Sequence, residues 1–166
     1  DGGEHWASAS VGLAGAPVHA LALDPAHPEL VYAGTDAGVF RSTDGGGEWT
    51  ATSTGLVDEL NDGLRVTALA LGPADPGLVY VATDDGGVFS SANRGDRWVA
   101  ASLGLTDDWG NAFPITALAA YPYDPRIVCA GTRDGDLFRS TDGGGDWTRA
   151  RLMSSPVSTL ALDPVS

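Results

Sequence analysis

The order of apolar and polar residues repeats three times along the chain. The first copy opens with a run of small and apolar residues, "VHALALD" at residues 18–24. A Pro-bounded turn follows, and then a run rich in β-branched and aromatic residues, "LVYAGT" at residues 30–35. A short Asp- and Gly-containing turn leads to "GVFRS" at residues 38–42, and a fourth run begins at a Trp. Such runs, separated by Gly and Pro turns, predict β-strands.

We expect four antiparallel strands in each copy, named A, B, C and D in chain order. Strand A shows little alternation of apolar and polar residues, which predicts burial on both faces. The turns between strands B and C are short and rich in Asp and Gly, as β-hairpins require. Nothing in the chain combines helical periodicity with helix caps. The pattern therefore predicts an all-β fold.

A short motif recurs at the predicted turn between strands C and D. "STDGGGEWT" at residues 42–50 and "STDGGGDWT" at residues 140–148 differ at one position. "SSANRGDRW" at residues 90–98 fits the same frame, and "DGGEHW" at residues 1–6 supplies its last part. In all four copies the Trp follows an Asp or Asn by five residues. Self-similarity at a period of about 40–50 residues indicates a repeat architecture.

The Ser-x-Asp-x-Gly-x-x-Trp motif resembles the Asp-box, or BNR repeat, of sialidases, sortilin-like receptor domains, photosystem II assembly factors and xyloglucanase-type glycoside hydrolases. The resemblance implies a β-propeller of four-stranded antiparallel blades with Asp-box turns. We expect the box residues to be structural, because a short carboxylate can accept backbone N–H groups, Gly permits positive φ, and Trp can pack against the neighbouring blade. They are Asp1, Trp6, Ser42, Asp44, Gly46, Trp49, Ser91, Asn93, Gly95, Trp98, Ser140, Asp142, Gly144 and Trp147.

The chain is predicted to be a single propeller segment with three full blades, at residues 18–56, 66–105 and 115–153. Residues 1–17 and 157–166 are expected to form partial blades. A propeller ring has about 4–8 blades, so further blades are expected from the same protein, from other copies or from a partner. Open blade edges also invite pairing with another chain.

The resemblance places the B–C turns and the D–A connections on one face, which we call the top face. Trp109 is the only Trp outside a box, and a loop that carries it beside several polar residues would suit stacking against a sugar. The alternative is that Trp109 or Phe113 fills the loop against the blade. The candidate ligand-binding residues on this face are Trp109, Asp107, Asp108, Asn111, Arg65, Arg133 and Asp134.

Catalysis by this chain alone is not expected. Glycoside hydrolysis needs two carboxyl groups across the scissile bond. The xyloglucanase-type resemblance implies a catalytic Asp in a Thr-Asp-x-Gly turn, which singles out Asp36 and Asp84, but those enzymes draw the second acid from a second propeller. Sialidases need an arginine triad, whereas only Arg65 and Arg133 lie on the expected face and the Arg-Ile-Pro motif of that family is missing.

Charge and the scattered reactive residues narrow the remaining possibilities. A net charge of -13 argues against binding to nucleic acid or to an anionic membrane surface. No apolar run approaches the ~20 residues that span a bilayer, so no membrane insertion is expected. The three His residues lack ligand spacing, so neither a metal site nor a cofactor is expected. His19 is expected to be packed or to face the central channel, and Cys129, in the place of Tyr32 and Tyr80, to lie in the core.

The sequence thus favours a non-catalytic binding or scaffold module for protein or carbohydrate. We expect an exported bacterial protein that is extracellular or at the cell surface, with the periplasm as a further possibility. One alternative is a part of a glycoside hydrolase whose other blades lie elsewhere. Another is a structural subunit that assembles through its open blade edges.

Overall fold

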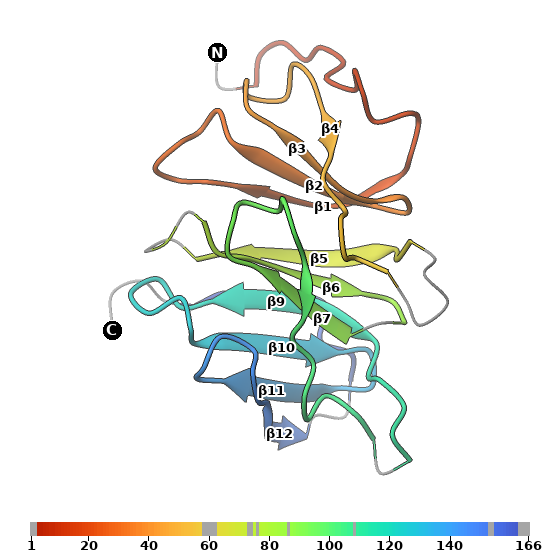
Figure 1. Cartoon of the computed structure of the whole chain (residues 1–166), viewed down its shortest axis with the longest axis vertical. Helices are drawn as coiled ribbons and strands as arrows, with labels where there is room; N and C mark the ends of the chain where they lie inside the picture. The colour runs from red at the N-terminus through yellow and green to blue at the C-terminus, as the bar shows by residue number, and fades with distance from the viewer. Residues whose placement is uncertain are drawn as a thin grey trace.

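The computed structural model describes residues 3–57, 63–72, 75, 77–85, 87–107, 109–152 and 155–162. Twelve strands in these residues form three four-stranded antiparallel sheets, and none of the described residues forms a helix that could cross a membrane (Figure 1). The strands are β1 (Val18–Leu23), β2 (Val31–Thr35), β3 (Gly38–Ser42), β4 (Thr50–Ala51), β5 (Val66–Leu71), β6 (Val79–Thr83), β7 (Gly87–Ser91), β8 (Val99–Ala100), β9 (Ile115–Ala120), β10 (Val128–Thr132), β11 (Asp136–Ser140) and β12 (Thr148–Leu152).

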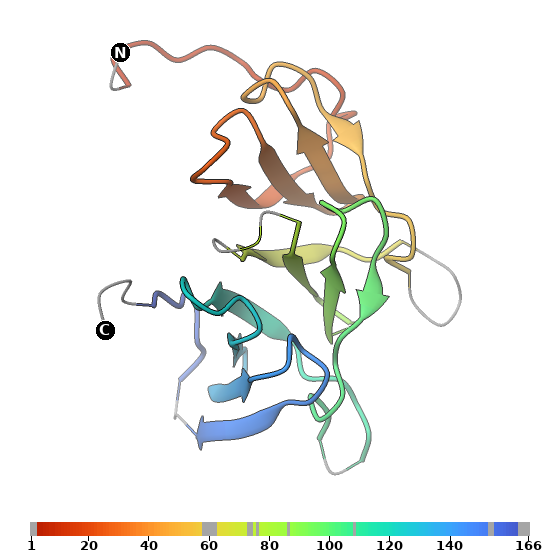
Figure 2. The ribbon, with the colours of Figure 1, turned by 60° about the vertical axis from the view of Figure 1, so that its left-hand side comes forward.

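Each sheet is a meander, because its strands pair in the order in which they follow along the chain. The sheets succeed one another along the long axis of the molecule, from β1–β4 to β9–β12 (Figure 2). The first strands of the three sheets lie next to one another, since β5 packs against both β1 and β9. The hydrophobic core fills the space between successive sheets, with one cluster around Trp98 and Leu56 and a second around Ile115 and Phe138.

The strand that is buried on both faces is the second of each sheet and not the first. All residues of β2 and of β6 are buried. In β5 buried and half-buried residues alternate, and in β1 no residue is buried. The expectation for strand A was therefore wrong. The physical reason is position: the first strand of each sheet is its inner edge strand. Among the described residues β1 also has a neighbouring sheet on one side only, the sheet of β5.

The segment after β12 continues the repeat at its inner edge. The backbone N–H of Val157 donates to Thr132 O at 3.0 Å, and Thr116 Oγ1 donates to Val157 O at 2.5 Å. The Val157 side chain packs on Gly131, as Val66 of the second sheet packs on Gly34 of the first. Residues 157–162 thus lie where the first strand of a next sheet would lie, although no strand is assigned to them.

The repeated motif, which we call the box motif, forms the turn between the third and fourth strands. Ser42 Oγ donates to Asp44 Oδ1 at 2.7 Å and accepts from the N–H of Gly46 at 2.9 Å. The same carboxylate oxygen accepts the N–H of Glu48 at 3.0 Å. The motif around Asp142 has the same bonds, and Asn93 accepts equivalent bonds through its amide oxygen. A hydroxyl and a short acceptor side chain together hold this turn.

The Trp of each box motif reaches the preceding segment of the chain. The indole N–H of Trp49 donates to Ala9 O at 2.8 Å. In the same way Trp98 donates to Thr52 O at 2.6 Å, and Trp147 donates to Ala101 O at 2.7 Å. Each acceptor lies three residues after the previous box Trp. Each Trp therefore joins its sheet to the part of the chain that follows the previous box motif.

The predicted core position of Cys129 is wrong, because Cys129 is only half-buried. Tyr32 and Tyr80, its counterparts in the other sheets, are fully buried, and each donates its hydroxyl to a backbone carbonyl of the next sheet. The third sheet has no such cover over Cys129 among the described residues. Partial burial still raises the pKa of the Cys129 thiol, which lowers its reactivity.

Candidate functional site

The top face is built by three equivalent contacts between a hairpin turn and the start of a sheet. The backbone N–H groups of Asp36, Asp84 and Arg133 donate to the carbonyls of residues 17, 65 and 114 at 3.3, 3.1 and 2.9 Å. The turns β2–β3, β6–β7 and β10–β11 therefore lie beside the ends of the connections that lead into β1, β5 and β9. The box motifs lie at the opposite face, where their turns bond to the turns between first and second strands, as in Gly45 N–H to Glu29 O at 2.8 Å.

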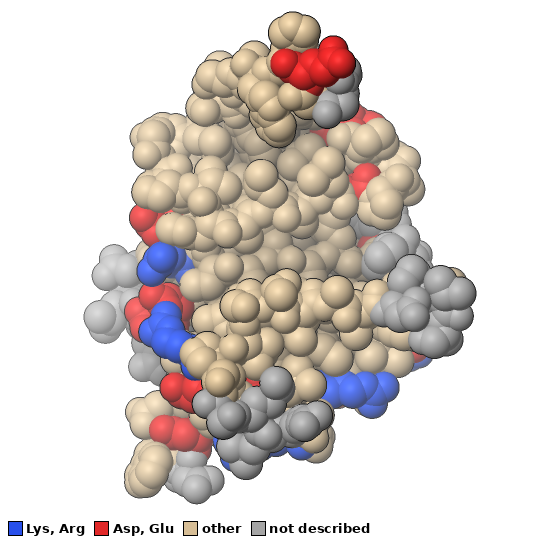
Figure 3. Space-filling view, turned by 180° about the vertical axis from the view of Figure 1, so that it is seen from behind, with Lys and Arg blue, Asp and Glu red and all other residues tan. Residues whose placement is uncertain are grey.

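Five charged or titratable side chains form a continuous chain across this face and across all three sheets. His19 Nε2 lies 2.6 Å from Asp36 Oδ1, and Arg65 Nε lies 2.9 Å from the same oxygen. Arg65 Nη1 also pairs with Asp84 Oδ2 at 3.1 Å, and Arg133 Nη2 pairs with Asp84 Oδ1 at 2.7 Å. Acidic and basic side chains alternate down the left edge in Figure 3. His19 thus belongs to the top face, and the expectation that it is packed in the core was wrong. The alternative, that it faces the channel, stays a prediction.

In this arrangement the candidate catalytic acids, Asp36 and Asp84, form ion pairs with the candidate binding arginines, Arg65 and Arg133. Both oxygens of Asp84 accept from arginines, and Asp36 Oδ1 is shared by His19 and Arg65. A glycosidase acid must instead point its carboxyl group at the glycosidic oxygen. All five side chains are partly exposed, so each ion pair contributes about 0–1 kcal/mol. Their joint effect is to hold three successive hairpin turns in one geometry.

The loop between the second and third sheets is folded around Asp107. Its carboxylate accepts the backbone N–H groups of Trp109 at 2.9 Å and of Asn111 at 2.8 Å, and the side-chain amide of Asn111 at 2.9 Å. The Asn111 side-chain hydrogen bond is the main cause that holds the pKa of Asp107 below its usual range. Asp107 and Asn111 thus shape the loop, while Asp108 lies outside the described residues.

Trp109 and Phe113 have opposite environments at the two ends of this loop. The Trp109 side chain is 85% exposed, whereas Phe113 is buried with its ring centroid 5.2 Å from that of Phe138. The guanidinium of Arg149 lies 5.3 Å from the Phe113 ring centroid, a cation–π distance. Phe113 therefore anchors the loop against the third sheet. Trp109 is held away from the core as an exposed aromatic surface.

Sequence reasoning gave no role to the pair of Asp136 and Arg149. Asp136 is buried at the start of β11, where the other two sheets have Gly38 and Gly87. Arg149 Nη2 lies 3.4 Å from Asp136 Oδ2, and Oδ1 has no hydrogen-bond partner among the described residues. The sequence did contain a signal for this pair, because the third copy of the repeat has a charged residue where the other two copies have glycine. Asp134 is exposed in the same turn.

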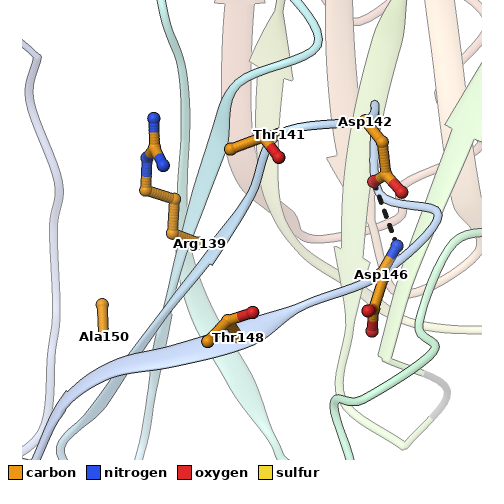
Figure 4. A pocket seen from close by; sticks show the side chains of 6 residues that line it. All are labelled: Arg139, Thr141, Asp142, Asp146, Thr148 and Ala150. Atoms are coloured by element: carbon orange, nitrogen blue, oxygen red, sulfur yellow. Dashed lines mark hydrogen bonds between the residues drawn. The ribbon is translucent and has the colours of Figure 1, made fainter.

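Two further surfaces have defined shapes. The inner strands present a shallow uncharged hollow of about 160 Å³ over Leu21, Leu69 and Leu118. A hollow of about 470 Å³ opens beside the third box motif (Figure 4). It is lined by Arg139, Thr141, Asp142, Asp146, Thr148 and Ala150. Within the described residues, no three His, Cys, Asp or Glu side chains are grouped as metal ligands would be.

Comparisons with known proteins identify the fold and not a family. No protein-family model matches the chain, and no curated protein matches it. A GH74 xyloglucanase from Xanthomonas campestris superposes with a TM-score of 0.67 and 24% identity, over 90% of this chain and 26% of that one. YCF48 bound to a D1 peptide gives a TM-score of 0.63 and 15% identity, over 81% of this chain and 40% of that one.

A designed protein and the lengths of the enzymes complete the comparison. The computationally designed Ika4 protein matches with a TM-score of 0.60 and 22% identity, over 90% of this chain and 81% of that one. An ancestral GH74 enzyme matches over 85% of this chain, which spans 19% of the enzyme. At these identities the likeness concerns the fold alone, and it confirms the prediction of an all-β propeller segment built of four-stranded antiparallel blades.

Proposed function

We propose that this propeller segment is a non-catalytic binding module that uses its top face, with Trp109 as the central contact residue. The carrying observation is that Trp109 is 85% exposed on a loop whose shape is fixed by Asp107 and Asn111. A large aromatic ring on a preorganised loop can bind a ligand with little loss of conformational entropy. Arg133, Asp134 and Arg65 supply polar groups on the same face.

Two ligand classes follow from this surface and from the structural neighbours. An exposed indole beside hydroxyl-binding polar groups suits a carbohydrate, and one neighbour is a xyloglucanase. A flat aromatic and polar surface also suits a peptide, and YCF48 is described as bound to a D1 peptide. A ligand outside the cell would agree with the proposed extracellular or cell-surface location. The net charge of -13 disfavours anionic polymers such as nucleic acid.

A role as part of a glycoside hydrolase has less support from this chain. The oxygens of Asp84 both face arginine side chains, and Asp36 lies between His19 and Arg65. A substrate would first have to displace those partners. We therefore favour a binding role over a hydrolytic role for this chain.

The test is a titration followed by tryptophan fluorescence and calorimetry. A xyloglucan heptasaccharide is one probe, and a library of unstructured basic and neutral peptides is the other. We expect Trp109→Ala to weaken binding about tenfold or more, as the loss of a central aromatic contact does. Trp6→Ala is the matched control, because Trp6 is 90% exposed but lies in a box motif. Binding that Trp109→Ala leaves unchanged, or no binding to either probe, would contradict the proposal.

A further inference from the structure

The hollow of Figure 4 reaches Ala150, a residue whose counterparts in the other sheets accept from the Trp of the next box motif. Within the chain, Trp49, Trp98 and Trp147 each donate an indole N–H to a carbonyl three residues after the preceding box Trp. Ala150 is the next position in that series, three residues after Trp147, and it lines the hollow. We propose that this hollow binds the N-terminal box motif of a second copy of the chain, with Trp6 donating to Ala150 O.

The first sheet provides an internal comparison for the hollow. There the equivalent hollow is lined by Arg41, Thr43, Asp44, Glu48 and Thr50, and its volume is about 230 Å³ against about 470 Å³ in the third sheet. The hollow of the first sheet does not reach Thr52, because Trp98 covers that residue. The hollow of the third sheet does reach the counterpart, Ala150. Its larger volume is thus the space that a docked box motif occupies elsewhere in the chain.

Residues 3–6, the described part of the N-terminal box motif, have the backbone shape of a docked one. Gly3 has a φ of 89°, close to the 98°, 88° and 90° of Gly46, Gly95 and Gly144. A Cβ at Gly3 would lie 3.5 Å from the Trp6 ring, so this glycine faces its Trp as Gly46 and Gly95 do. Yet Trp6 is 90% exposed, whereas Trp49, Trp98 and Trp147 are 7%, 2% and 4% exposed. These residues thus present a preformed turn with the Trp6 side chain in solvent, which suits docking into the hollow.

Charges on the two surfaces are complementary at matching positions. Arg41 of the first sheet donates to Asp96 Oδ1 at 2.8 Å, and Asp96 stands two residues before Trp98. Arg139 stands in the place of Arg41 in the third sheet and lines the hollow. In the N-terminal box motif the residue two positions before Trp6 is Glu4. Docking of Trp6 at Ala150 therefore brings an exposed Glu4 to Arg139.

The segment after β12 does not compete for this hollow. Val157 packs on Gly131 at the inner edge of the third sheet, where Val66 packs on Gly34 of the first. The inner strand position is thus filled from the same chain, while no described residue covers the position beside β12. Gly12, Gly55 and Gly104 each lie against the backbone carbonyl of a docked Trp, where a Cβ would come within 2.5 Å of that oxygen. Met153, which lies outside the described residues, stands at this position after Trp147, so a box motif at Ala150 cannot copy that close backbone approach. The proposed contact therefore rests on the indole of Trp6 and on the pairing of Glu4 with Arg139.

Sedimentation velocity of the 166-residue chain, from about 1 μM to about 1 mM, tests the proposal. We expect association that rises with concentration. Trp6→Ala and Arg139→Glu should each raise the dissociation constant about tenfold or more, because both remove a central contact. The exchange of charges in the Glu4→Arg, Arg139→Glu double variant should restore most of the affinity lost by Arg139→Glu. Trp109→Ala, which removes the other highly exposed Trp, should associate as the parent chain does.

All substituted side chains are exposed, so far-ultraviolet circular dichroism should report the parent fold for every variant. A monomer at all concentrations overturns the proposal. Association that persists unchanged in Trp6→Ala also overturns it, because the copies would then meet through another surface. If the double variant does not recover the affinity lost by Arg139→Glu, Glu4 and Arg139 do not pair in the contact between copies. These outcomes are independent of ligand binding at Trp109, which lies in the loop between the second and third sheets.

Discussion

Trp98 donates its indole N–H to the backbone carbonyl of Thr52, 2.6 Å away, and so joins the second sheet to the first. The backbone N–H of Trp98 donates to Thr54 O at 2.9 Å as well. The side chain is 2% exposed and belongs to the core cluster between these sheets. One residue therefore contributes a polar bond and apolar packing to the same contact between sheets.

Replacement of Trp98 separates these two contributions. Trp98→Phe keeps an aromatic ring but leaves Thr52 O without its donor, and we expect a loss of about 1–3 kcal/mol of unfolding free energy. Trp98→Ala also leaves a cavity, and we expect a loss of about 3–5 kcal/mol. Urea denaturation measures both. Trp6→Phe is the control and should leave stability unchanged, because Trp6 is 90% exposed. Equal stability of Trp98→Phe and the parent would show that the hydrogen bond adds nothing.

Asp44 makes the first box motif sensitive to acid. The hydrogen bond from the Glu48 N–H, followed by that from Ser42, holds the pKa of Asp44 below its usual value of 3.8. A folded pKa below the unfolded one means that this contribution is fully present above about pH 4 and is lost as the pH falls through the folded pKa. Thermal melts between about pH 2 and pH 7 should show this loss.

Asn93 indicates which substitution removes that dependence without breaking the turn. Its amide oxygen accepts from Ser91 at 2.8 Å and from the Arg97 N–H at 3.0 Å, the bonds that Asp44 accepts in its own turn. We expect Asp44→Asn to retain stability near pH 7 and to reduce the acid-dependent loss. Asp44→Ala should lower the melting temperature at every pH. An unchanged acid profile in Asp44→Asn would assign the loss to other carboxylates.

Arg94 is strained in the second box motif. Its φ is 60°, a left-handed conformation in which the other two copies have Gly45 and Gly143. We expect Arg94→Gly to stabilise the chain by about 0.5–1 kcal/mol, because relief of a left-handed side chain outweighs the entropy cost of glycine. Gly45→Ala is the reverse experiment. The new Cβ would meet nothing within 4 Å, so any loss of unfolding free energy comes from backbone strain alone. Chemical denaturation of both variants gives the two values, and a destabilised Arg94→Gly would contradict the assignment.

Much of the fold could be predicted because the information is local. Apolar runs such as residues 30–35 and the box motif at residues 42–50 recur with fixed spacing, and each copy forms one sheet. What could not be predicted depends on the neighbours of a sheet. Cys129 fills the same strand position as Tyr80, yet it is half-buried because no described sheet covers it. Val18 is likewise 42% exposed where Val66 is fully buried.

The candidate site shows the same division. The position of Asp36 in a hairpin turn followed from the sequence, but its pairing with Arg65 joins two residues from different sheets, and only the tertiary structure brings them together. The sequence also left open whether Trp109 or Phe113 fills the loop. The answer depends on Phe138, whose ring packs against Phe113 and leaves Trp109 outside.

Tyr80 should make the contact between the second and third sheets sensitive to alkali. Its hydroxyl donates to Pro125 O at 2.9 Å, and burial raises its pKa to about 12 from 10.0. A folded pKa above the unfolded one means that the contribution is full below about pH 10 and is lost as the pH rises towards 12. Tyr80→Phe should lose about 1 kcal/mol at neutral pH and show a weaker alkaline loss.

Denaturation at a fixed urea concentration between pH 8 and pH 12 measures the slope with which stability falls as the pH rises. Tyr32, whose pKa is also raised chiefly by burial, continues to titrate in Tyr80→Phe, so we expect the slope to fall without vanishing. The Tyr32→Phe, Tyr80→Phe double variant should be flatter still, because each hydroxyl holds one successive sheet to the next. If Tyr80→Phe keeps the full alkaline loss, the buried hydroxyl of Tyr80 is not its source.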